Sequence, residues 1–463
     1  ESWLTPPVFR DAVRGYLASH ADGAVTTADF IRAVSAATGR DIGPVIASFL
    51  DHPGIPEVAV DLSCTAGRAA VQLRQRRHRL RPHQSSDDRS FHWHIPMCLR
   101  YPDTAAGGRK SLTQCTVLDR PEARLELPGA GCPTWVMPNA DAAGYYRYRV
   151  DRDQLAALVR APLSTRERVD LSHNLRGWLL GGQLPIGDGL DALGALGRGR
   201  DRHLVQATMA ILKDVVEHLA GPADRAAVGA LVRRLLGARA RAVGLVPRRV
   251  ESENDTLLRP VLVGFVGRYG APPALVRPAT RLTETWLKSG SGIEPGVIAA
   301  TLGIAAFHGD ARLYDRFVAA LRAAHQIGDK TRVALLVAAL GEFRQPALIA
   351  RNLELLGQFD HAVRMELVRA LMFNPAARAP TVAHLQRVWS QLTGRDVLLL
   401  LAPLYVGIAC DRAEMDAITA LAGRVSRVRE LIAPQLRLAR YRSALCTDYR
   451  TVQSDGVRAF LRR

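Results

Sequence analysis

The sequence predicts a multidomain, mainly α protein that consists of a short helical segment, a small β-sandwich and a large helical array. Its 463 residues are enough for about three domains. Hydrophobic residues, 48% of the total, recur with a helical period up to residue 54, with a period of two over about 55–150, and with a helical period again from 151 on. Charged residues make up 23%, an ordinary globular share that excludes a disordered or collagen-like chain.

The first part of the chain is expected to be helical. The apolar residues of 8–17 suit one amphipathic helix. In a second helix, Thr26 stands three residues before Asp29, which is a capping-box spacing, and Gly39 suits the C-terminal stop. The Pro-Gly-Ile-Pro segment at 53–56 then breaks the helical pattern.

The second part alternates apolar and polar residues. The clearest case is Phe91–Tyr101, where every second side chain is apolar, and Pro96 indicates an edge strand or a bulge. Shorter strands are predicted at 57–62, 69–75, 112–118, 123–127, 134–137 and 145–150. Several short strands separated by turn residues predict a small β-sandwich.

The third part reads as one helix after another. Leu204, Ile211 and Leu219, for example, lie on one helical face. Because the connections are short and rich in Gly, Pro and Asp, we expect antiparallel neighbours that stack as a solenoid without a strict repeat. The longest apolar run, Val397–Cys410, is too short to span a membrane and is expected to form a buried helix pair, so no membrane partner is expected.

The chain is strongly basic, with 62 Lys and Arg against 44 Asp and Glu, a formal net charge of +18. Most of the basic residues are arginine rather than lysine. A codon bias of the genome would explain this preference as well as a functional need for arginine would. Two Arg-rich stretches, 68–81 and 424–463, are candidates for binding nucleic acid. Aromatic residues are only 6%, which leaves few platforms for base stacking, so solvated surfaces are the favoured interpretation and no nucleic-acid partner is predicted.

Catalytic and metal-binding patterns are missing from the sequence. It contains no H-E-x-x-H, no P-loop and no G-x-S-x-G. His92 and His94 share the polar face of one strand, but without a third ligand they are interpreted as surface histidines. Gly187 and Gly189, which flank an aspartate, lie between helical patterns and are expected in a loop between helices rather than a phosphate loop. The sequence therefore predicts no catalytic, cofactor-binding or metal site in this chain.

The six cysteines form no C-x-x-C pair; they stand at positions 64, 98, 115, 132, 410 and 446. Four of them fall in the strand-rich part, where a disulfide is conceivable. The favoured expectation is that all are reduced and structural.

Four motifs follow one another in order: Thr-Thr-x-Asp at 26–29, Pro-Gly-Ile-Pro at 53–56 after Phe49, Trp-x-Ile-Pro at 93–96, and Gly-Tyr-Tyr-Arg at 144–147 between Asn139 and Asp151. Helical segments at 253–270, 308–324 and 337–355 come next. This series resembles the C-terminal part of the zinc aminopeptidases of the membrane-alanyl and puromycin-sensitive type (gluzincin peptidases). Phe49 stands where that family more often has Trp, and the 76–90 stretch is longer and more polar than the family pattern.

The resemblance implies three domains: a helical tail of a thermolysin-like catalytic domain (1–54), an antiparallel β-sandwich (55–150), and an α-α superhelical, HEAT-like domain (151–463). The family's H-E-x-x-H zinc site would lie upstream of Glu1, so zinc is expected in the missing catalytic half. The chain starts without Met and is expected to be a fragment or a processed chain.

The function that the resemblance implies is to brace and cover the active site of a peptide-trimming enzyme and to enclose its peptide. Its partners would be the upstream catalytic domain and peptide substrates, and the chain alone would be inactive. A stand-alone HEAT-like scaffold that binds a protein or peptide is the alternative, and a nucleic-acid-binding array is a third hypothesis. The compartment stays open, with the cytoplasm favoured over other locations.

Overall fold

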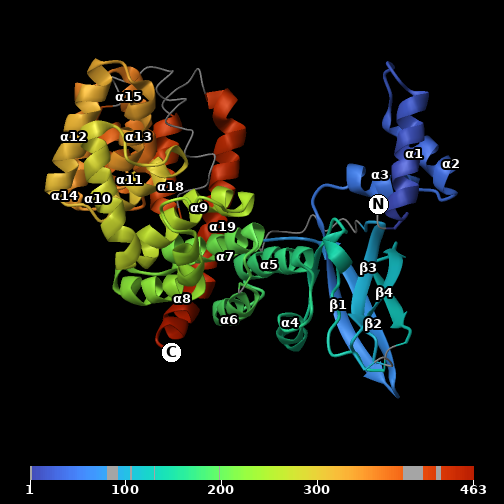
Figure 1. Ribbon diagram of the computed structural model, residues 1–463. Helices are drawn as coiled ribbons and strands as arrows, with labels where there is room; N and C mark the ends of the chain where they lie inside the picture. Colours follow the sequence, from blue (N-terminus) through green and yellow to red (C-terminus); the bar gives the residue numbers. More distant parts are fainter. Residues whose placement is uncertain are drawn as a thin grey trace. The chain divides into compact units, whose positions relative to one another are not determined.

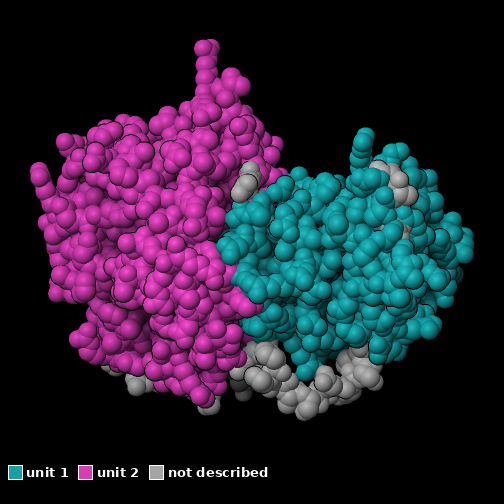
Figure 2. Space-filling model, turned by 90° about the horizontal axis from the view of Figure 1, so that it is seen from below, with its two compact units in different colours: residues 1–184, 188–196 teal, residues 185–187, 197–463 magenta. Residues whose placement is uncertain are grey.

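A computed structural model describes residues 3–80, 92–104, 107–129, 131–197, 199–388, 410–423 and 429–463. The chain divides into two compact units, which are coloured separately in Figure 2. Unit 1 consists of Glu1–Leu184 with Asp188–Leu196, and unit 2 of Pro185–Gly187 with Gly197–Arg463. The predicted domain boundaries after residues 54 and 150 stay predictions.

Unit 1 begins with three helices, α1 (Pro6–Ser19), α2 (Thr27–Thr38) and α3 (Gly43–Asp51). The predicted capping box is confirmed: the Thr26 hydroxyl accepts a hydrogen bond from the Asp29 amide, and the Asp29 carboxylate accepts one from the Thr26 amide. Gly39 ends α2 in the left-handed conformation with φ 65°, which a residue with a side chain adopts less readily.

Six strands form two sheets in the middle of unit 1, and Figure 1 labels the four longest of them, β1 to β4. The strands are β1 (Pro56–Thr65), β2 (Arg68–Arg77), β3 (Ile95–Pro102), β4 (Ser111–Leu118), β5 (Glu122–Leu127) and β6 (Arg147–Arg149). One sheet has the order β5-β2-β1-β6, and the other pairs β3 with β4. The prediction of purely antiparallel pairing is wrong at one place, because β6 runs parallel to β1.

Alternation in the sequence located most of these strands correctly. Ile95, Met97, Leu99 and Tyr101 of β3 are buried, as their period-two spacing predicts. The strand predicted at 134–137 is wrong, because this segment shares only one isolated bridge, between Met137 and Arg100. Phe91 lies outside the described residues.

The expectation of reduced cysteines is wrong, because all six are paired as disulfides. Cys98 and Cys115 stand directly opposite each other in the β3–β4 register, and Cys64–Cys132 joins the end of β1 to the segment after β5. Disulfides persist mainly in oxidising compartments, which counts against the preference for the cytoplasm.

Three helices connect the sheet region to the rest of the chain: α4 (Arg152–Leu158), α5 (Thr165–Leu180) and α6 (Ile186–Leu196). A second capping box, between Ser164 and Glu167, starts α5. Gly187 and Gly189 lie inside α6, so the prediction of a loop at these glycines is wrong.

Unit 2 is helical throughout its described part. Its helices are α7 (Arg202–Asp214), α8 (Arg225–Val243), α9 (Glu253–Phe265), α10 (Pro273–Ser289), α11 (Ile298–Phe307), α12 (Ala311–Gln326), α13 (Lys330–Leu340), α14 (Pro346–Leu355), α15 (His361–Phe373), α16 (Arg378–Arg387), α18 (Arg412–Gly423) and α19 (Arg429–Leu461). The odd-numbered helices from α7 to α15 contact one another in succession, whereas α10 contacts α12 and α14 contacts α16. Figure 1 shows these two rows as α11, α13 and α15 beside α10, α12 and α14.

No described helix combines the length and apolar content that crossing a membrane would need. The run Val397–Cys410, predicted to form a buried helix pair, lies outside the described residues except for Cys410.

The odd-numbered helices α7, α9, α11, α13 and α15 are called the inner row below. Their close packing gives a testable expectation at Gly341, which follows α13. A Cβ atom on Gly341 would lie 2.5 Å from the Cβ atom of Ala370 on α15 and 3.0 Å from the Ala370 carbonyl carbon. Gly341→Ala is therefore expected to force α13 and α15 apart and to lower the free energy of unfolding of unit 2 by about 2 kcal/mol.

The matched control is Gly357→Ala, where the added Cβ atom meets no heavy atom within 4 Å. This variant is expected to match the wild type or to gain slightly, because alanine restricts the unfolded chain. Urea unfolding followed by circular dichroism measures both variants, and equal stability of the two would contradict the prediction.

Candidate functional site

A cavity in the described part of unit 2 has a volume of about 1460 Å³. Its wall is built mainly by the inner row of helices, with residues from α7, α9, α11, α13 and α15 and from the turns that follow them. Apolar and aromatic side chains line much of this surface, among them Phe265, Phe307, Val337, Ile349 and Phe373. A concave surface with a mainly apolar lining and a few polar groups is typical of a ligand-binding site.

Two π-helical turns bring polar side chains into the cavity. They are η2 (Val215–Leu219) after α7 and η4 (Val266–Gly270) after α9. The Tyr269 hydroxyl in η4 donates a hydrogen bond of 3.2 Å to Glu217 Oε1 in η2, and Lys213 Nζ lies 3.9 Å from Glu217 Oε2. Burial raises the pKa of Glu217, and the nearby Lys213 ammonium opposes this shift. π-Helical turns of this kind are frequent at functional sites.

A second polar contact joins η4 to the end of α13. Arg268 Nη1 forms an ion pair with Glu342 Oε1 across the wall of the cavity. Burial raises the pKa of Glu342, while the charge of Arg268 acts to lower it. Each of these two side chains is about one-third exposed or less, so the pair is screened less than one on the outer surface.

Arg344 lines the cavity and contacts an aromatic ring rather than a carboxylate. Its guanidinium lies over the ring of Phe307, 4.9 Å from the ring centroid, in a cation–π contact. Burial, followed by the positive charge of Arg225, lowers the pKa of Arg344. Throughout the described chain, no carboxylate lies within 4 Å of either Arg225 or Arg344. Both guanidinium groups are therefore available to an anionic ligand.

The charges that line the cavity are unequal in sign. Five cationic side chains face three carboxylates, which gives 5 − 3 = +2 with histidine neutral; the cations are Lys213, Arg225, Arg268, Arg344 and Arg369, and the carboxylates are Glu217, Glu342 and Glu366. Such a cavity favours ligands that carry negative charge and an apolar body.

The residues weighed as sites from the sequence lie elsewhere. The rings of His92 and His94 stack with centroids 6.1 Å apart, and neither belongs to a group of three metal-ligating side chains in the residues that the structure describes. The 68–81 stretch is mainly strand β2, where Arg74 pairs with Asp61 and Arg76 with Glu57.

The residues present do not fit the zinc set that the resemblance implies, in which two histidines belong to an H-E-x-x-H helix. The sequence lacks this pattern. In the described residues, the one group of at least three His, Cys, Asp or Glu side chains with suitable spacing is His218, Cys410 and Cys446, and its two sulfurs are bonded to each other. No catalytic step is therefore derived through zinc in this chain.

Sequence reasoning missed the polar residues of the cavity. Glu217, Tyr269 and Arg344 are spread over more than a hundred residues and share no motif. The sequence offered only an indirect indication. Each of the three residues comes shortly after a helix that the spacing of its apolar residues predicts.

Comparison with known proteins gives a consistent result. A family model described as "ERAP1-like C-terminal domain" matches residues 135–397. The puromycin-sensitive aminopeptidase of Caenorhabditis elegans is 21% identical over 329 residues, which cover 68% of this chain and 33% of that protein. Aminopeptidase M1 of Arabidopsis thaliana is 22% identical over 307 residues, which cover 62% of this chain and 33% of that protein. The chain therefore spans about a third of the length of these relatives.

Proposed function

We propose, from the premise that this chain belongs to the ERAP1-like C-terminal domain family, that it is the non-catalytic C-terminal portion of a zinc aminopeptidase and encloses peptide substrates. The relatives that match it are aminopeptidases, and peptides carry a terminal carboxylate on a partly apolar chain. The observation that supports enclosure is the cationic cavity with the unpaired Arg225 and Arg344.

The proposal assigns a part to each region of the chain. Residues 1–54 would be the tail of the catalytic domain, residues 55–150 a β-sandwich that braces it, and residues 151–463 a HEAT-like superhelix that covers the active site. The two contacting rows of helices in unit 2 support the last assignment, because stacked helix pairs build such arrays.

Arginine suits this role for a chemical reason. A guanidinium can donate two parallel hydrogen bonds to one carboxylate, and this contact is stronger where water is partly excluded. Arg344 already lies over the ring of Phe307, a contact that helps to hold its guanidinium at the cavity wall. Aromatic and apolar side chains around it would contact the body of a bound peptide.

Peptide binding to the whole chain tests the cavity. The double variant Arg225→Ala/Arg344→Ala is expected to weaken binding of a fluorescent peptide with a free C-terminal carboxylate by about tenfold or more, because charge-assisted hydrogen bonds are lost. Fluorescence anisotropy measures the dissociation constant at fixed salt.

Arg312→Ala is the matched control for this experiment, because Arg312 is an exposed arginine of α12 that does not line the cavity. It should bind the peptide like the wild type. If both variants weaken binding equally, the effect comes from overall charge and the cavity assignment is lost.

A second measurement addresses the architectural role. We would mix this chain with a separately produced upstream segment of the same gene that contains H-E-x-x-H, and add zinc. Release of N-terminal residues from aminoacyl reporters should appear only in the mixture. No release from the mixture, where the intact polypeptide is active, would overturn the bracing role and leave a separate binding scaffold as the alternative.

A further inference from the structure

A disulfide and a histidine lie together in unit 2, and none of the three residues is among those that line the cavity. Cys410 precedes α18 and is bonded to Cys446 of α19, and His218 lies in the π-helical turn η2. The two sulfurs and a ring nitrogen of His218 all lie within 4.8 Å of one another. Cys410 is buried, whereas His218 and Cys446 are half-buried and so accessible from one side.

This spacing suits a tetrahedral metal ion once the sulfur–sulfur bond is broken. Zinc binds thiolate sulfur at about 2.3 Å, which places two sulfurs of a tetrahedral site about 3.8 Å apart. Two reduced cysteine sulfurs in van der Waals contact are separated by a similar distance. The imidazole nitrogen then needs only a small side-chain adjustment to complete the third contact, because it is already within 4.8 Å of both sulfurs.

We propose that reduction of the Cys410–Cys446 disulfide converts this cluster into a zinc-binding site whose ligands are two thiolates, the His218 imidazole and one water molecule. The proposal goes beyond the proposed function and does not depend on it. In the oxidised chain the sulfurs are bonded to each other and cannot act as thiolate ligands, so metal binding is controlled by the redox state.

The reaction balances with a dithiol as reductant. The protein disulfide accepts two electrons and two protons, and the two thiols of the reductant become a disulfide. Zinc then replaces the two thiol protons, which are released to solvent, while neutral His218 donates its ring lone pair without losing a proton.

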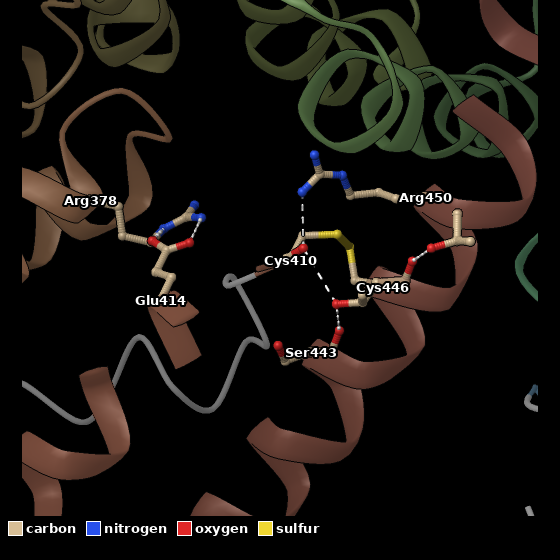
Figure 3. The surroundings of a disulfide bond; sticks show 8 residues. Arg378, Cys410, Glu414, Ser443, Cys446 and Arg450 are labelled. Atoms are coloured by element: carbon tan, nitrogen blue, oxygen red, sulfur yellow. Dashed lines mark hydrogen bonds and ion pairs between the residues drawn. A yellow bond between two sulfur atoms is a disulfide. The ribbon is translucent and has the colours of Figure 1, made fainter. Parts of the chain in front are cut away.

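Contacts that do not involve sulfur hold the ligands in place after reduction (Figure 3). Arg450 Nη1 donates a hydrogen bond of 3.1 Å to the Cys410 carbonyl oxygen, which ties Cys410 to α19. Glu414 of α18 pairs with Arg378 of α16 at 3.4 Å, which anchors the helix that follows Cys410. The turn η2 packs against α19, so His218 keeps its position beside Cys446.

The surroundings of His218 leave its ring able to act as a ligand. Burial lowers the pKa of His218 to about 4, although the charge of Asp214 opposes this shift, so the ring is neutral at pH 7. Within the described residues the His218 ring has no hydrogen-bond partner, so its lone pair is available. Lys213, Arg378 and Arg450 also act on His218. The two thiolates then offset the charge of the dication.

The test uses the whole chain after reduction with a phosphine. The phosphine becomes the phosphine oxide, with its oxygen taken from water, and the protein is then desalted in the absence of air. Cobalt(II) serves as the probe, because thiolate ligands give it a charge-transfer absorption band. Reduced wild type is expected to bind cobalt at this site with thiolate absorption, and zinc should displace it. The oxidised chain is expected to bind neither metal at this site.

Variants separate this site from the other thiols. Cys410→Ser/Cys446→Ser should lose one metal ion per chain, whereas Cys64→Ser/Cys132→Ser should keep this site. His218→Ala should weaken metal binding at least about tenfold. Removal of a residue that only supports a metal ligand already costs about 10–100-fold in affinity, and loss of a ligand itself should cost no less. His325→Ala, at another partly buried histidine of unit 2, should leave the affinity unchanged.

X-ray absorption of the zinc-loaded, reduced wild type keeps the proposal testable should a variant fail to fold. Two sulfur ligands and at least one imidazole nitrogen are expected at the site in this wild-type protein. Metal binding that is unchanged in Cys410→Ser/Cys446→Ser, an affinity unaffected by His218→Ala, or a zinc spectrum without imidazole would each overturn the proposal.

Discussion

Arg100→Ala is expected to lower the free energy of unfolding of unit 1 by about 3–5 kcal/mol, because it leaves a buried carboxylate without its counter-ion. The carboxylate belongs to Glu167, whose side chain is 1% exposed. Arg100 on β3 donates to both of its oxygens, with Nε 2.7 Å from Oε1 and Nη2 bound to Oε2. This pair joins the sheet region to helix α5.

The remaining partners of Glu167 cannot replace Arg100. The backbone amides of Ser164 and Asp141 donate hydrogen bonds of 2.8 and 3.1 Å to the carboxylate. Burial acts to raise the pKa of Glu167, but the hydrogen bond from Arg100 and then these amides hold it below its usual range. Without Arg100, burial is opposed only by the two amides, so the pKa of Glu167 should rise. The carboxyl group must then either take up a proton or remain charged without a counter-ion.

Urea unfolding followed by tryptophan fluorescence measures the effect, since Trp3, Trp93, Trp135 and Trp178 all belong to unit 1. Arg124→Ala is the control, because its 3.0 Å pair with Glu126 is more than half exposed on both sides and should be worth less than about 1 kcal/mol. Adding Glu167→Gln to Arg100→Ala should recover part of the loss, because the unpaired charge is then gone. An equal loss in Arg100→Ala and Arg124→Ala would contradict the prediction.

Asp170→Asn is expected to stabilise unit 1 at pH 7 and to remove a pH dependence between about pH 4 and pH 7. Burial raises the pKa of Asp170 to about 6, against the hydrogen bond from Asn139 and the charge of Arg147, which both act to lower it. The unfolded chain titrates near the ordinary value of about 3.9. The folded state therefore binds this proton more tightly than the unfolded state.

The sign of the effect follows from this difference. The stabilising contribution of protonated Asp170 is fully present below about pH 4 and is lost as the pH rises through about 6. A shift of about two pKa units corresponds to at most roughly 3 kcal/mol at pH 7. Asparagine is neutral at every pH and keeps an oxygen that can accept the hydrogen bond of 3.3 Å that Asn139 Nδ2 donates to Asp170 Oδ2.

Other groups of unit 1 also titrate, so the informative quantity is the difference between the two proteins. The stability of Asp170→Asn minus that of the wild type should be near zero at pH 4 and grow to about 1–3 kcal/mol at pH 7. Asp153→Asn, at an exposed aspartate in the first turn of α4, should show no such growth. A difference that is flat with pH for Asp170→Asn would show that this carboxyl group is not held protonated.

Local patterns in the sequence predicted local structure well. The Thr26–Asp29 capping box, the left-handed Gly39 and the alternation through β3 each depend on residues a few positions apart. The disulfides and the Arg100–Glu167 pair could not be predicted in the same way. Their partners meet only through strand register and helix docking, which one sequence does not specify.

The cavity was hidden for a related reason. Glu217 and Tyr269 stand where π-helical turns extend α7 and α9, and the wider turn leaves no distinct mark in the spacing of apolar residues. The order of motifs supplied the family instead, which the family model over residues 135–397 confirms.

The cavity wall is divided among helices from α7 to α16, and this has a consequence for the order of assembly. In stacked arrays each pair contacts only its neighbours, so pairs can in principle form or open one after another. The lining of the cavity runs from Met209 of α7 to Pro380 of α16, so the cavity is complete only when all the helices that line it have stacked. A ligand that occupies it therefore selects the fully stacked chain by mass action and makes an otherwise sequential array unfold as one cooperative body.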